Sequence, residues 1–110
     1  MPLSEKVRIE IFIPDPPDVS YRVLRQEIAS ELSYASGGCT EISAKGKYCS
    51  PHGHMISDDI RILFSDAPIQ FERDRVTLGE YVDWVRDAAQ QSLENEEEIL
   101  ISVYPVCHGN

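Results

Sequence analysis

Apolar and polar residues alternate over residues 7–13, and this pattern predicts a β-strand. The β-branched residues share one face and the other residues share the opposite face: Val7, Ile9, Ile11 and Ile13 against Arg8, Glu10 and Phe12. The first face suits a protein core. Pro14 ends the alternation, because proline lacks the N–H group that a β-ladder needs.

Helical spacing follows over residues 20–36. Leu24, Ile28 and Leu32 recur every four residues, which predicts an amphipathic helix. Asp18 or Ser20 can cap the beginning of this helix, and the glycines at 37 and 38 permit the left-handed backbone that often ends one.

A second helix is predicted from Thr77 to about Leu93, before the acidic run at 96–98. Thr77 and Glu80 have the spacing of a capping box, in which each side chain accepts a hydrogen bond from a free amide of the first turn. Val76 and Tyr81 have the spacing of a hydrophobic staple and support the same boundary.

Three more strands are predicted, over residues 39–48, 59–65 and 99–106. In the middle one, Ile60, Ile62 and Phe64 share one face, which we expect to meet the core. Arg61 and Leu63 would then lie on the outer face.

The order strand, helix, strand, strand, helix, strand predicts an α+β, ferredoxin-like βαββαβ sandwich formed by residues 1–110 as a single domain. This arrangement resembles the ferredoxin-like superfamily, which implies a four-stranded antiparallel sheet of order 4-1-3-2 with two helices on one face. The Gly37-Gly38-Cys39-Thr40 junction and the following strand with Gly46 resemble small uncharacterised bacterial proteins of this fold. The resemblance brings no catalytic residue, and fold alone does not assign function.

The charge of the chain narrows the range of partners. Nineteen acidic residues against ten basic ones give a formal charge of −9, which repels nucleic acid and anionic membrane surfaces. No apolar run approaches the length of a membrane span, and residues 1–6 do not resemble a signal peptide. We therefore expect a cytoplasmic protein with neither nucleic acid nor membrane as a partner.

Cys49, His52 and His54 form the one cluster of metal-ligand residue types within a short segment. They predict either a site for a divalent metal such as zinc or a solvent-exposed polar turn with no cofactor. Cys107 and His108 carry the same ligand types, but the expected topology puts them at the other end of the sheet, about 20 Å away along a strand of six residues.

The sheet face without helices is the main candidate site. We expect it to carry the following interface or ligand residues: Arg8, Glu10, Phe12, Arg61, Leu63, Leu100 and Tyr104. Apolar side chains on neighbouring strands would form a patch of the kind that binds partners. This favours a non-enzymatic oligomerising or protein- or ligand-binding module, with a homodimer as the expected assembly. The alternatives are an enzyme or small-molecule binder with a pocket between paired sheets, and divalent-metal binding or sensing through the hairpin histidines.

Overall fold

The computed structural model describes residues 3–93 and 99–109. Its elements, in chain order, are β1 (Leu3–Pro14), α1 (Val19–Ser36), β2 (Thr40–Cys49), β3 (Met55–Ala67), α2 (Arg75–Ser92) and β4 (Leu100–Gly109). The strands form one sheet of order β2-β3-β1-β4, in which every neighbouring pair is antiparallel. The predicted ferredoxin-like arrangement and its sheet order are confirmed.

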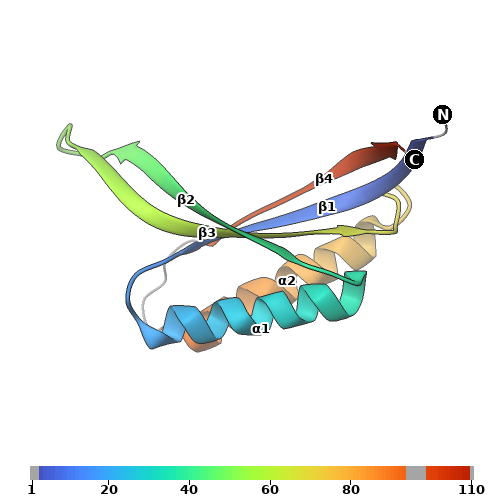
Figure 1. Ribbon diagram of the computed structural model, residues 1–110, viewed down its shortest axis with the longest axis horizontal. Helices are drawn as coiled ribbons and strands as arrows, with labels where there is room; N and C mark the ends of the chain where they lie inside the picture. The colour runs from blue at the N-terminus through green and yellow to red at the C-terminus, as the bar shows by residue number, and fades with distance from the viewer. Residues whose placement is uncertain (1–2, 94–98, 110) are drawn as a thin grey trace.

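Both helices cover the same face of the sheet, which leaves the opposite face open (Figure 1). The β2–β3 hairpin and the paired ends of β1 and β4 rise away from the helices on opposite sides of the molecule. The core lies between the sheet and the helices, where the predicted inner face of β1 is completely buried at Val7, Ile11 and Ile13. It packs against Leu24, Ile28 and Leu32 of α1 among others.

Helix α1 ends at Ser36 as its sequence predicts and begins at Val19, one residue before the predicted start. The backbone N–H of Ser20 donates to the Asp18 carboxylate at 2.8 Å, so Asp18 is the N-terminal cap. At the other end, Gly37 has a φ angle of 86° and its N–H donates to the Ser33 carbonyl at 2.8 Å. This left-handed cap turns the chain toward β2.

Helix α2 begins earlier than predicted, and the capping-box assignment at Thr77 is wrong. The helix begins at Arg75, so Thr77 lies within its first turn. Asp74 occupies the N-cap position, but its carboxylate accepts hydrogen bonds from the Gln70 N–H and the Arg73 guanidinium instead of from the helix. The preceding turn, fixed by these bonds, decides where the helix begins.

The predicted face of β3 is also wrong. Leu63 lies opposite Ile11 of β1 and is completely buried under the helices, so it belongs to the core and not to the open face. Arg61, two residues away, is likewise on the helix side, whereas Ile62 and Phe64 are on the open face and only half-buried. Apolar residues lie on both faces of β3, so the sequence alternation alone does not show which face meets the core. The pairing of β3 with β1 determines it.

The strands extend beyond their alternating segments, because β-pairing continues along each neighbour. β1 pairs with β4 from Leu3 opposite Gly109 to Phe12 opposite Leu100.

Neither helix in the described part of the chain has a stretch apolar and long enough to cross a bilayer. The acidic run at 96–98 lies outside the described residues.

Candidate functional site

An unbroken row of four apolar residues crosses the open face from edge to edge. Ile42 of β2 pairs with Ile62 of β3, Ile62 pairs with Phe12 of β1, and Phe12 pairs with Leu100 of β4. Directly paired residues of this kind have side chains in contact distance on one face of a sheet. The two ends of this apolar row are 44% and 59% exposed at Ile42 and Leu100, and its two central members are half-buried.

A polar cluster lies beside the apolar row on the same face. Arg8 of β1 binds Asp66 of β3 through two hydrogen bonds, from Nε at 2.8 Å and from an Nη at 3.0 Å. The His108 Nε2 atom, on β4, lies 2.8 Å from the same carboxylate. The Arg8 guanidinium also stacks 4.7 Å above the centre of the Phe64 ring. The Asp66 carboxylate of β3 therefore contacts side chains from both β1 and β4.

Asp66 stays ionised in this cluster. The hydrogen bond from Arg8 lowers the pKa of the Asp66 carboxyl below its ordinary value, and His108 contributes in the same direction. Burial of the carboxyl acts the other way and is outweighed.

Glu10 and Tyr104 form the second half of the polar cluster. The Tyr104 hydroxyl donates a hydrogen bond to the Glu10 carboxylate, between neighbouring strands β1 and β4. This bond is the main cause of a raised pKa at Tyr104, because the carboxylate stabilises the protonated phenol. The two carboxylates of the polar cluster, Asp66 and Glu10, are thus bonded to a guanidinium and to a phenol.

The structure brings together five of the seven residues predicted for the open face: Arg8, Glu10, Phe12, Leu100 and Tyr104. The other two, Arg61 and Leu63, are on the helix side. The Arg61 Nε donates to the Asp15 carboxylate at 2.9 Å there.

Sequence reasoning missed several members of this face: Ile42, Ile62, Phe64, Asp66 and His108. The alternation in 39–48 already placed Ile42 on one face. The β3 residues could be assigned to the open face only once the register of β3 with β1 was known. The partnership of Asp66 and His108 joins positions 42 residues apart and has no local signal.

The metal-ligand candidates lie at the tip of the β2–β3 hairpin, where Cys49, His52 and His54 are all exposed. Ser50 and His54 close the turn through a backbone hydrogen bond of 2.7 Å. Within residues 3–93 and 99–109, no three His, Cys, Asp or Glu side chains gather as a metal site would require. Metal binding by these three residues stays a prediction.

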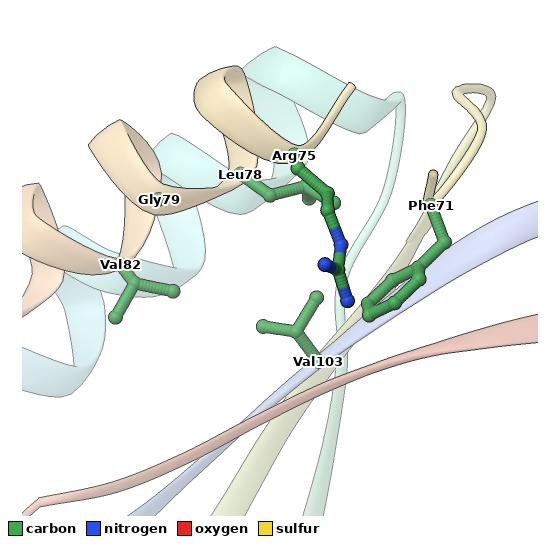
Figure 2. Close-up of a pocket in the computed structure, with 6 residues that line it drawn as sticks. All are labelled: Phe71, Arg75, Leu78, Gly79, Val82 and Val103. Carbon is green, nitrogen blue, oxygen red and sulfur yellow. The ribbon is translucent and has the colours of Figure 1, made fainter. Parts of the chain in front are cut away.

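A shallow apolar groove of about 290 Å³ lies on the helix side, between the first turns of α2 and β4 (Figure 2). Leu78 and Val82 of α2 face Val103 of β4, and the Arg75 guanidinium lies over the Phe71 ring at 5.1 Å. The walls are nearly all apolar, with one cation at the opening.

Comparison with known proteins supports the fold and assigns no specific function. No protein-family model and no curated protein matches this sequence. CutA1 from Oryza sativa aligns over 97% of this chain and 84% of its own, with 13% identity and a TM-score of 0.57. The divalent cation tolerance protein CutA1 from Thermus thermophilus aligns over 96% and 87%, with 13% identity and a TM-score of 0.55. CPII from Thiomonas intermedia K12 aligns over 100% and 94%, with 18% identity and a TM-score of 0.50. These likenesses place the chain among ferredoxin-like folds.

Proposed function

We propose that this chain is a non-enzymatic module that associates with a second copy of itself through the open face of its sheet. The observation that carries the proposal is the apolar row of Ile42, Ile62, Phe12 and Leu100, which spans all four strands on the face that no helix covers. A contiguous apolar patch rimmed by polar groups is typical of an interaction surface.

The charges of the open face favour a second copy as the partner. The whole chain carries a formal charge of −9, which opposes association in general. On the open face, however, Asp66 is paired with Arg8, and Glu10 accepts from Tyr104. Two such faces can approach with Asp66 and Glu10 each already hydrogen-bonded to a partner on its own copy.

The row can serve both partners of a twofold dimer. In an isologous interface the same patch is used by both copies, so the row on one copy packs against the row on the other. Burial of the exposed ends at Ile42 and Leu100 then supplies hydrophobic stabilisation on both copies, at about 25 cal/mol per Å² of apolar surface.

Native mass spectrometry of the untagged protein tests this proposal. We expect a dimer for the unaltered chain and a folded monomer for the double variant Ile42→Lys, Leu100→Lys, because both side chains are already partly exposed and the fold tolerates a charge there. The double variant Val19→Lys, Val23→Lys is the matched control, since these residues are 58% and 50% exposed on α1, which covers the opposite face of the sheet. A monomeric unaltered chain, or an unchanged mass for the double variant, would contradict the proposal.

A second candidate function is the binding of a small molecule between two open faces. The polar cluster favours it, because Arg8, Glu10 and Tyr104 offer a cation, a carboxylate and a phenol beside an apolar row. The structure of CPII, similar in fold, holds ADP, AMP and acetate. A mass increment on the native dimer that disappears in Tyr104→Phe would support this candidate, and a metabolite screen without any thermal stabilisation would count against it.

A further inference from the structure

Three arginines converge on a groove on the helix side of the sheet, away from the open face. The groove has a volume of about 260 Å³ and lies between α1 and the strands β2 and β3. We call it the arginine groove, and its lining residues are Arg22, Arg25, Gln26, Ala29, Glu41 and Arg61. Because β2 is an edge strand, no further strand of the described chain closes this side of the molecule.

Two of the arginines are fixed in place by a shared carboxylate. The Asp15 side chain accepts from Arg61 at 2.9 Å and lies 3.0 Å from an Nη atom of Arg25. Arg25 also reaches the Pro14 carbonyl at 3.4 Å, and its side chain is only 13% exposed. These two guanidinium groups are therefore held in position at the groove before any ligand arrives.

The other interactions in the groove leave guanidinium N–H donors available to a ligand. Glu41 lies 3.9 Å from both Arg25 and Arg61, which is longer than a hydrogen bond. The third cation, Arg22, is exposed and makes no ion pair within the described part of the chain. Three guanidinium groups thus face two carboxylates, and only Asp15 is bound at hydrogen-bond distance.

We propose that the arginine groove binds a small dianion, either a phosphate group or a pair of neighbouring carboxylates. A guanidinium presents parallel N–H donors whose spacing matches two oxygens of such an anion. Arg22, Arg25 and Arg61 supply those donors, and the Gln26 amide adds another one turn along α1 from Arg22. The ligand displaces the loosely held Glu41 and leaves Asp15 in place. In a chain with a formal charge of −9, the three guanidinium groups outnumber the two carboxylates at this groove.

Isothermal titration calorimetry with inorganic phosphate and with succinate tests the proposal and separates the two anion types. We expect at least one of them to bind the unaltered protein, and the affinity for it to fall about tenfold in Arg22→Gln, because a hydrogen bond to a charged group is lost. Arg22 has no ion-pair partner among the described residues, so this variant keeps its fold. Glu41→Gln should bind about threefold more tightly, since a competing carboxylate is removed.

Arg86→Gln is the matched control. Arg86 is an exposed arginine on α2, outside the groove, and its loss changes the total charge by the same amount. We expect its affinity to equal that of the unaltered protein. The proposal is overturned if neither anion binds, or if Arg22→Gln and Arg86→Gln have the same affinity. Because the groove lies on the helix side, these outcomes do not depend on whether the open face forms a dimer.

Discussion

Ile11 and Leu63 face each other across the central pair of antiparallel strands, and neither side chain has any exposed surface. This pair joins β1 and β3 under the two helices. Its burial fixes the orientation of both strands, because one residue of slip would move every side chain of β3 to the other face. The apolar row on the open face depends on the same register, through Phe12 opposite Ile62.

Leu63→Ala should lower the free energy of unfolding by about 2–5 kcal/mol, since it leaves a cavity in the core. Leu100→Ala, at a position 59% exposed, should cost less than about 1 kcal/mol. Urea unfolding measures both, with the protein dilute enough to be monomeric. Equal small losses for the two variants would contradict the placement of Leu63 in the core.

Tyr81→Phe should raise the free energy of unfolding by about 1 kcal/mol. The Tyr81 hydroxyl is buried and has no hydrogen-bond partner within the described residues, and burial raises its pKa to about 12. Removing an unpaired buried hydroxyl removes its desolvation cost. Tyr104→Phe is the matched comparison, and should lower stability because the Tyr104 hydroxyl donates to Glu10. Thermal unfolding distinguishes the two, and a loss of stability in Tyr81→Phe would show that its hydroxyl has a partner.

Gly37→Ala should destabilise the protein by about 1 kcal/mol, because a Cβ atom is unfavourable at a φ angle of 86°. Gly38→Ala should have an effect within about 0.5 kcal/mol, since Gly38 does not have a positive φ and a Cβ there meets no atom within 4 Å. Chemical denaturation of the two variants side by side gives the comparison. Similar effects at both positions would be inconsistent with the left-handed cap of α1.

Asp66→Asn should reduce stability at neutral pH by about 1 kcal/mol, as the charged partner of Arg8 is lost. The pKa of Asp66 is lower in the folded protein than in the unfolded chain, where it is about 3.9. Its contribution is therefore complete above the unfolded pKa and is lost as the pH falls through the folded pKa. The difference between the unaltered protein and Asp66→Asn should shrink below about pH 4.

Urea unfolding over a pH series checks this dependence. Asp83→Asn is the control, because Asp83 is exposed on α2 and has no ion pair among the described residues. We expect it to stay within about 0.5 kcal/mol of the unaltered protein at every pH. A difference for Asp66→Asn that persists undiminished at the lowest pH would mean that the charge of Asp66 is not its source.

Local patterns in the sequence determined most of the fold. The alternation in β1 predicted which of its faces is buried, and the ends of α1 were indicated by Asp18 or Ser20 and by the glycine pair at 37 and 38. These features need only neighbouring residues, since strand alternation and helix capping act within a few positions. The order of elements followed from them, and with it the ferredoxin-like arrangement.

The beginning of α2 shows where local signals stop being sufficient. Thr77 and Glu80 have capping-box spacing, yet the helix begins at Arg75. Asp74 is held by its contacts with Gln70 and Arg73 in the preceding turn. The hydrogen bonds of that turn place the beginning of the helix two residues before the one that the local signal predicts.

The candidate sites were decided by tertiary structure. In β3 both faces carry apolar residues, so only pairing with β1 could place Leu63 inside and Ile62 outside. The polar cluster likewise joins Arg8, Asp66 and His108 from three separate strands. The sequence by itself determined the elements and their order, because those depend on contacts a few residues long. Only the tertiary structure decided which side chains meet on each face, because strand register is set by pairing between distant segments.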